Sequence, residues 1–163
     1  MGAGKSTTGK KLAERLKYRF VDTDHLIEER AGMPITGIFS EKGEAYFRNA
    51  EHEVLTELSG YNEDLIVSTG GGAPCFLNNM QILNSSGITV YLKIDPEELF
   101  TRLTRARMKT RPLISDKSPE ELLSYINSKL TEREKFYNQS KIIIDGNGVD
   151  ISILEKKIRE YRG

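Results

Sequence analysis

The sequence predicts an α/β fold in which a parallel β-sheet is covered by helices on both faces. Short apolar segments that read as strands alternate with helical segments of about 10–15 residues, which is typical of such sheets. Three loops rich in acidic residues or glycines lie where parallel strands are expected to end, and ligands bind at that edge. At 163 residues the chain is long enough for one domain with its own core, so we expect a single domain over residues 1–163.

Hydrophobic spacing and turn residues predict the order of the elements. Helices are expected over residues 5–17, 24–31, 43–58, 77–86, 95–103, 122–137 and 151–161. Strands are expected over residues 18–22, 64–69, 88–94 and 141–145. The stretch 34–43 is broken by Pro and Gly and is expected to form a short helical turn, whereas the basic stretch 104–119 is expected to be a mobile surface segment.

The composition excludes some classes of partner. The 24 basic and 24 acidic side chains cancel, so no net field attracts nucleic acid or an anionic membrane. No apolar run approaches the roughly 20 residues that span a bilayer, and no secretory signal pattern is found. The single cysteine, Cys75, rules out an intrachain disulfide and fits a reducing compartment. We therefore expect a cytoplasmic protein with neither nucleic acid nor a membrane as a partner.

The stretch Met-Gly-Ala-Gly-Lys-Ser-Thr at the start of the sequence matches the last part of the phosphate-binding pattern G-x-x-x-x-G-K-[ST]. In this pattern backbone N–H groups surround phosphate oxygens, the lysine adds positive charge and the hydroxyl group reaches Mg²⁺. A helix that begins at Lys5 would direct the positive end of its dipole at the same anion. Taken alone, a chance Gly- and Ser-rich start is an equally good interpretation, so residues further along must decide.

Asp22 and Asp24 lie just beyond a predicted strand. Beside a phosphate loop, such carboxylates can hold Mg²⁺ through water or orient a hydroxyl group for attack. The alternative is that Asp24 only caps the helix that follows.

Arg48 and Glu51 are neighbours on one face of a predicted helix. An exposed pair of this kind would have no functional meaning. Alternatively, Glu51 holds the guanidinium so that its free edge binds a substrate carboxylate.

Gly70-Gly71-Gly72 follows a predicted strand directly. Three consecutive glycines cost backbone entropy, which makes sense where a ligand approaches the main chain or where a tight turn needs positive φ. A merely flexible loop fits this position poorly.

Basic residues crowd the stretch 104–119, where a solvated loop is the simplest interpretation. Phosphoryl transfer, however, needs positive charge over the β- and γ-phosphates, often carried by a closing lid. Arg111, next to Pro112, is the best candidate for that charge. Arg133 and Tyr137, four residues apart on a helix, could supply a further anion contact. His25, His52 and Cys75 lack catalytic or metal-binding neighbours in the sequence and are expected to be structural or exposed.

The ordered set G-A-G-K-S-T, D-x-D, F-R-x-x-E, G-G-G, R-P-L and R-x-x-x-Y resembles the shikimate kinase family over nearly the whole chain. F-R-x-x-E followed by T-G-G-G separates this set from adenylate, cytidylate and gluconate kinases, which share the nucleoside-monophosphate-kinase-like P-loop fold. The resemblance implies a three-layer parallel sheet of order 2-3-1-4-5, a substrate-binding region at about 24–60 and a mobile lid at about 105–118. It also implies phosphorylation of the 3-hydroxyl of shikimate by ATP with Mg²⁺, in chorismate and aromatic amino acid biosynthesis, by a monomer.

The resemblance also assigns roles to single residues. Around the ATP phosphates it places Gly2, Ala3, Gly4, Lys5, Ser6 and Thr7, with Arg111 reaching in from the lid and Arg105 beside the adenine. Mg²⁺ would be held by Ser6 and, through water, by Asp22. Shikimate would be bound by Asp24, Arg48, Arg133 and the loop Gly70, Gly71 and Gly72, with Glu51 holding Arg48. The catalytic groups would be Lys5, Asp24 and Arg111.

Two other functions stay open at this point. Another small-molecule kinase of the same fold, such as gluconate kinase, would differ only in the acceptor pocket. A catalytically silent nucleotide-binding or regulatory domain would have no need to keep Lys5, Asp24 and Arg48 together.

In the sheet order of this family, the strand that leads into the phosphate loop lies at the centre. That strand and the first glycine of the pattern would precede Met1, so we expect about 10 further residues upstream. Without the strand, each buried unpaired backbone group would cost about 1–3 kcal/mol, and the chain as written is expected to fold poorly.

Overall fold

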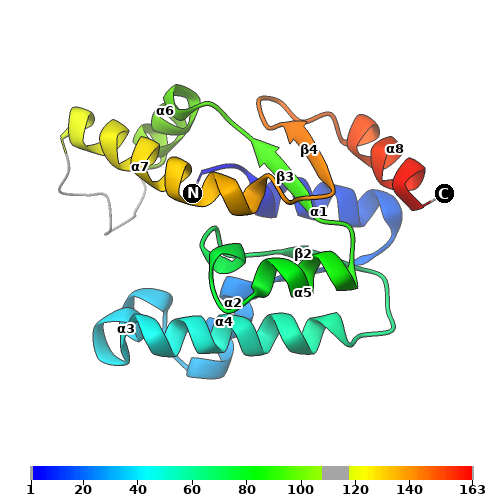
Figure 1. Ribbon diagram of the computed structural model, residues 1–163, viewed down its shortest axis with the longest axis horizontal. Coiled ribbons are helices and arrows are strands. Elements are labelled where there is room, and N and C mark those ends of the chain that lie inside the picture. Colours follow the sequence, from blue (N-terminus) through cyan, green and yellow to red (C-terminus); the bar gives the residue numbers. More distant parts are fainter. Residues whose placement is uncertain (1, 108–117, 163) are drawn as a thin grey trace.

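The computed structural model describes residues 2–107 and 118–162, which form an α/β protein (Figure 1). Its helices are α1 (Lys5–Leu16), α2 (Thr23–Ala31), α3 (Ile35–Glu41), α4 (Gly43–Ser59), α5 (Asn79–Ser86), α6 (Pro96–Arg107), α7 (Pro119–Tyr137) and α8 (Ile151–Arg162), with a 3₁₀ turn η1 (Ala73–Cys75). Its strands are β1 (Arg19–Asp22), β2 (Leu65–Ser68), β3 (Val90–Lys93) and β4 (Ile142–Asp145).

The four strands form two separate parallel pairs, β1 with β2 and β3 with β4. In the first pair Asp22 lies opposite Ser68, and in the second Lys93 lies opposite Asp145. These pairs correspond to positions 2-3 and 4-5 of the expected order, so the order 2-3-1-4-5 of one continuous sheet stays a prediction. Because both strands of a parallel pair end at the same edge, β1 and β2 bring the loops after Asp22 and Ser68 together.

An apolar cleft of about 410 Å³ runs between the two pairs. Side chains of β2, such as Ile66 and Val67, and of β3, such as Val90 and Leu92, line it together. Within the part of the chain that the structure describes, β2 and β3 each pair with a strand on one side only. The expected strand before the phosphate loop stays a prediction, and this cleft is the place where such a strand would pair.

The cleft leads to a stability prediction. We expect an added N-terminal segment of about six Val- and Ile-rich residues to raise Tm by more than about 5 °C, because it would pair with two strand edges and bury apolar side chains. The measurement is thermal unfolding followed by circular dichroism. A Gly- and Ser-rich extension of equal length is the control, and equal Tm values for the two extended chains would contradict the prediction.

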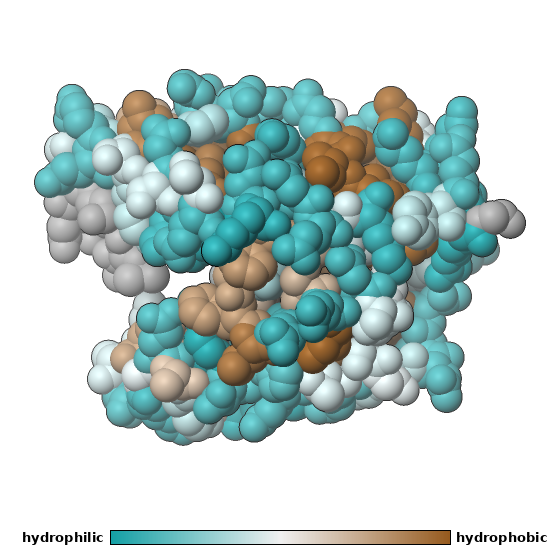
Figure 2. All heavy atoms as spheres, viewed as in Figure 1, coloured by the Kyte–Doolittle hydropathy of each residue, from teal (hydrophilic) through white to brown (hydrophobic). Residues whose placement is uncertain are grey.

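Three apolar clusters form the core of the described part of the chain. One joins α6 and α7, the second joins α1 and α8 to β4, and the third joins α2, α3 and α4. Their buried members are Ile94, Leu99, Leu103, Leu122 and Ile126; Leu12, Ile142, Leu154 and Ile158; and Ile27, Ile38, Phe47 and Val54. On the face drawn in Figure 2, apolar side chains also gather in the hollow across the middle of the molecule.

Some element boundaries differ from the sequence-based prediction. α5 begins at Asn79 because Leu77 and Asn78 have φ of 49° and 58°, outside the right-handed helical region. The basic stretch is shorter than predicted at both ends. Residues 104–107 continue α6, where Arg and Ala favour a helix, and Pro119 begins α7 after a capping box. Within the described ranges, no helix is both long and apolar enough to span a membrane.

Candidate active site

The phosphate-loop sequence forms a tight turn into α1. Gly2 and Gly4 have φ of 66° and 77°, a left-handed conformation that favours glycine. The Thr8 amide donates to the Gly4 carbonyl at 2.8 Å, and helix α1 starts at Lys5 as predicted. The first turn of α1 contains no acidic residue, so its positive dipole end is not neutralised by its own side chains. This geometry suits an anion at the start of α1.

The loops that follow β1 and β2 meet the first turn of α1. The Ser6 hydroxyl donates to Asp22 Oδ2 at 2.7 Å and lies 3.3 Å from the Ser68 hydroxyl. Hydroxyl and carboxylate oxygens are the ligands that Mg²⁺ prefers, so the predicted Ser6 and Asp22 pair fits that ion. Among the described residues, no group of three or more His, Cys, Asp or Glu side chains forms a metal cluster. The sequence analysis missed Ser68, which becomes a neighbour only through strand pairing.

The start of α2 differs from the sequence-based prediction. Asp22, not Asp24, caps the helix, because its side chain accepts the Asp24 amide at 3.1 Å. The prediction that Asp24 is the cap is therefore wrong, and its carboxylate is left for another role. Buried Thr23 accepts the Gly70 amide at 3.2 Å, which ties α2 to the glycine loop.

Arg48 lies on α4 in a cluster of aromatic and acidic side chains. Its Nη1 donates to Glu51 at 2.7 Å, and its Nε and Nη2 donate to Glu44 at 3.1 and 3.0 Å. These contacts use three of the five N–H donors of a guanidinium. The guanidinium carbon also lies 4.1 Å from the centre of the Phe76 ring. The interpretation of Arg48 and Glu51 as a merely exposed pair is wrong, since the Glu51 side chain is 1% exposed.

Close packing explains two of the three consecutive glycines. None of the three has positive φ, so the tight-turn explanation is wrong. A Cβ added to Gly70 would lie 2.5 Å from Glu51 Oε1 and 2.9 Å from Asp24 Oδ1. A Cβ added to Gly72 would lie 2.8 Å from Arg48 Nη1. Glycine at these positions therefore lets charged side chains lie directly against the main chain.

Asp24 and Glu51 carry buried oxygens that face the glycine loop. Within residues 2–107 and 118–162, Asp24 Oδ1 and Glu51 Oε1 are the buried side-chain atoms that lack a hydrogen-bond partner. Burial raises the pKa of Asp24, and the neighbouring Asp22 carboxylate raises it further, although Lys5 opposes this. Burial also raises the pKa of Glu51, against the hydrogen bond and positive charge of Arg48. A carboxylate with a raised pKa is a stronger base, and Asp24 can accept a hydrogen bond from a ligand hydroxyl.

Arg133 lies on α7. Burial raises the pKa of Glu51, Cys75 and Tyr137, and the charge of Arg133 opposes this at each of them, so Arg133 lies within electrostatic range of the Arg48–Glu51 pair. Figure 1 shows η1, which follows the glycine loop, between α7 above and α4 below. Asp24, Arg48 and Arg133 thus lie in one charged neighbourhood, and their roles in binding stay predictions.

Arg105 is exposed on α6, and Arg111 lies outside the described residues. His25 is exposed and pairs with Glu29 on its own helix. His52 Nδ1 lies 2.7 Å from the side-chain oxygen of buried Asn79, which supports the structural interpretation.

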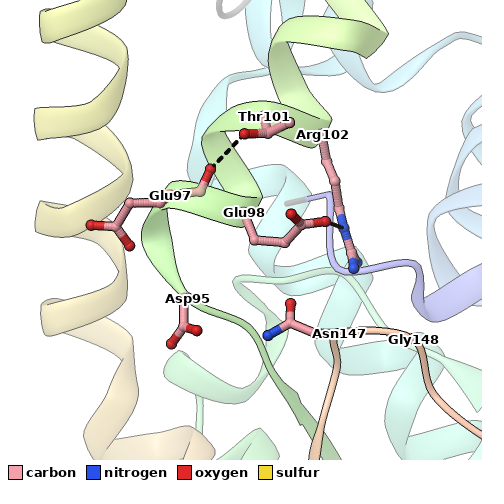
Figure 3. A pocket seen from close by; sticks show the side chains of 7 residues that line it. All are labelled: Asp95, Glu97, Glu98, Thr101, Arg102, Asn147 and Gly148. Carbon is pink, nitrogen blue, oxygen red and sulfur yellow. Dashed lines mark hydrogen bonds and ion pairs between the residues drawn. The ribbon is translucent and has the colours of Figure 1, made fainter.

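A hollow of about 520 Å³ opens between α6 and the loop after β4 (Figure 3). Its lining consists of Asp95, Glu97, Glu98, Thr101, Arg102, Asn147 and Gly148. Arg102 Nε donates to Glu98 at 2.7 Å and its Nη2 donates to the Gly146 carbonyl at 3.2 Å. Helix α6 also packs on the phosphate loop. The Leu103 side chain is so close to Gly2 that a Cβ added there would lie 3.3 Å from it. The sequence analysis missed Arg102, although it lies three residues before Arg105 on the same helix.

The fold and site define a class of protein. Parallel strands, a glycine loop that turns into a helix N-terminus, and a Ser–Asp pair beside it are the parts of a P-loop nucleotide-binding protein. The half-buried Asp24 lies next to that loop, within electrostatic range of both Lys5 and Arg48.

Comparisons with known proteins identify the family within this class. The sequence profile described as "Shikimate kinase" matches residues 1–161. A shikimate kinase of Azobacteroides pseudotrichonymphae is 49% identical over 143 residues, covering 88% of this chain and 84% of the relative. One of Bacteroides fragilis is 44% identical over 163 residues, covering 99% and 90%.

Solved structures agree with the sequence comparisons. The crystal structure of a shikimate kinase from Bacteroides thetaiotaomicron has a TM-score of 0.89 at 39% identity, over 99% of this chain and 93% of that chain. A shikimate kinase from Acinetobacter baumannii in complex with shikimate has a TM-score of 0.83 at 37% identity, over 99% and 88%. The chain belongs to the shikimate kinase family and is an ATP-dependent kinase. The predicted fold class and function are confirmed, and the gluconate-type kinase and the silent domain are not favoured.

Proposed function

We propose that this protein transfers the γ-phosphoryl group of ATP to the 3-hydroxyl of shikimate, giving shikimate 3-phosphate and ADP. The observation that carries the proposal is the position of a half-buried carboxyl group, Asp24, beside both the phosphate loop and Arg48. Asp24 is close enough to Lys5 and Arg48 for both charges to lower its pKa. An acceptor that carries both a carboxylate and hydroxyl groups matches these groups, and a relative of 37% identity was solved in complex with shikimate.

The acceptor carboxylate binds between Arg48 and Arg133. The three contacts of Arg48 with Glu44 and Glu51 hold its guanidinium, and two donors remain for an anion. The Asp24 carboxylate accepts a hydrogen bond from the acceptor hydroxyl, with the main chain of the glycine loop alongside. Asp24 thereby orients the 3-hydroxyl and takes its proton as the oxygen attacks phosphorus.

The nucleotide lies along the phosphate loop with its base towards the hollow of Figure 3. The acidic lining of that hollow repels phosphate but accepts hydrogen bonds from an amino group, so it suits the base rather than the phosphates. Arg102, in addition to Arg105, is a candidate adenine contact. Lys5 binds the β and γ oxygens, and Arg111 adds charge from the lid at about 105–118.

Mg²⁺ is the cofactor that this site would take, held by Ser6 and, through water, by Asp22. When bound, the ion offsets the negative charge of the phosphates that the α1 N-terminus and Lys5 attract. The monomeric state, the cytoplasmic location and the absence of nucleic-acid or membrane partners stay predictions.

A coupled assay of ADP release tests the proposed function. With MgATP, shikimate should be turned over and gluconate should not. Turnover of gluconate without turnover of shikimate would assign the acceptor site to another small-molecule kinase. Failure with both acceptors, together with nucleotide binding, would favour the silent domain.

Gly72→Ala tests the packing of the guanidinium on the main chain. The added methyl group would meet Arg48 Nη1 at 2.8 Å, so we expect KM for shikimate to rise about 10-fold, which corresponds to about 1.4 kcal/mol. KM for ATP should stay within about twofold of the wild-type value. Gly37→Ala is the control, because its Cβ would meet nothing closer than 3.7 Å. An unchanged KM for shikimate in Gly72→Ala would show that the guanidinium does not need this position.

A further inference from the structure

Tyr137 ties α7 to the glycine loop through its hydroxyl group. That hydroxyl donates to the Gly71 carbonyl at 2.5 Å, 66 residues away in the sequence. Arg133 lies one helical turn before Tyr137 on α7, so the two side chains are neighbours on one face of the helix. The hydroxyl therefore links the glycine loop to the part of α7 that carries Arg133.

The surroundings of Tyr137 make this position rigid. Burial raises the pKa of its phenol, so the group stays protonated and able to donate at neutral pH. Its ring packs on the Tyr91 ring of β3, with centroids 5.0 Å apart and planes tilted by 39°. The hydroxyl therefore has a fixed place between α7 and the glycine loop.

Side chains from two other elements hold the rest of this loop. Thr23 on α2 accepts the Gly70 amide at 3.2 Å, and Asn79 on α5 donates to the Ala73 carbonyl at 2.9 Å. Tyr137 contacts Gly71, which lies between Gly70 and Ala73 in the loop and directly before Gly72. Because Gly72 packs against the Arg48 guanidinium, the position of the loop also affects that arginine.

We propose that Tyr137 is a positioning residue for the acceptor carboxylate, because its hydroxyl fixes the glycine loop, against which Arg48 packs, to the helix that carries Arg133. This inference rests on the proposed function, in which both arginines bind that carboxylate. Loss of the hydroxyl would leave the two arginines in place but widen the range of distances between them. Acceptor binding would suffer first, because two charged contacts require one spacing.

Tyr137→Phe removes the hydroxyl and keeps the ring. We expect KM for shikimate to rise about 10-fold, with kcat and KM for ATP within about threefold of wild type. In an Arg133→Lys background the same change should raise KM for shikimate less than about twofold, since the pair of arginines whose spacing Tyr137 sets is then broken. A rise of the same size in both backgrounds, or a fall in kcat alone, would overturn the proposal.

Tyr91→Phe is the matched control, because it removes the hydroxyl of the tyrosine that packs on Tyr137. It should leave KM for shikimate within about twofold. Amide hydrogen exchange of residues 70–73 provides a readout that does not need turnover. Exchange should become faster in Tyr137→Phe and stay unchanged in Tyr91→Phe, even if shikimate proves not to be the substrate. Unchanged exchange in Tyr137→Phe would overturn the positioning role.

Discussion

Replacing Lys5 with alanine is expected to lower kcat at least about a thousandfold, which corresponds to about 4 kcal/mol of transition-state stabilisation. Lys5 begins α1, directly after the left-handed turn at Gly4, and its ammonium group belongs to the same charged neighbourhood as Asp24. Phosphoryl transfer depends on placed positive charge, because the charge of the transferred group spreads over its oxygens. The measurement is steady-state turnover of shikimate with MgATP in the coupled assay.

Lys11→Ala provides the matched control for this prediction. Lys11 is also on α1 but is exposed, and its loss should leave kcat within about twofold. Circular dichroism should give similar spectra for both variants, since alanine favours a helix at either position. Near-normal kcat in Lys5→Ala would contradict the assignment of the phosphate site.

Replacing Arg48 with alanine is expected to weaken shikimate binding about 100-fold and to leave ATP binding nearly unchanged. Two charged hydrogen bonds to the acceptor carboxylate would be lost, each worth about 1.5–3 kcal/mol. Arg133 lies on another helix, α7, and would still supply one anion contact. Isothermal titration calorimetry with each ligand measures the two affinities separately.

The stability of the Arg48→Ala variant needs its own measurement. Removal of the arginine leaves Glu51 buried without its partner, and breaking such a pair costs about 3–5 kcal/mol of folding free energy. The double variant Arg48→Ala/Glu51→Gln avoids this uncompensated charge and should still bind shikimate weakly.

Arg30→Ala is the control, because it also removes an arginine that pairs with a glutamate of α4. Arg30 pairs with Glu57 at the same 2.7 Å distance, but both side chains are about half exposed, so little should change. A collapse of ATP affinity in Arg48→Ala, with shikimate binding intact, would contradict the role in carboxylate binding.

Local sequence was sufficient for the fold class and for the types of site residue. The 3.6-residue spacing of Leu12, Ala13 and Leu16 predicts α1, and the structure has this helix at Lys5–Leu16. The glycines of the phosphate loop act through the backbone and the lysine acts through its side-chain charge. Both lie within a few residues of each other, so a short motif contains most of this chemistry. The basic, acidic and glycine motifs pointed to the family because their order along the chain could be read directly.

Other features depended on contacts between residues far apart in the sequence. Asp22 and Asp24 both suit a helix N-cap, and only the structure shows that Asp22 is the cap while Asp24 faces the glycine loop. Positive φ, one of the two reasons considered for the glycines at 70 and 72, was likewise wrong, because side chains of α2 and α4 pack against both positions. The spacing of residues along the sequence does not show which side chains of other helices lie against a glycine, because that depends on how the helices pack.

By itself, the sequence determined that this chain is an α/β kinase with a phosphate loop, because hydrophobic period and motif chemistry are local properties. Tertiary structure alone decided that Arg48 packs on Gly72 and that Tyr137 donates to Gly71, since these side chains come from α4 and α7. It also decided that the strands form two pairs with an apolar cleft between them. The physical reason is that strand pairing and the burial of charge depend on distances across the fold, which no short stretch of sequence specifies.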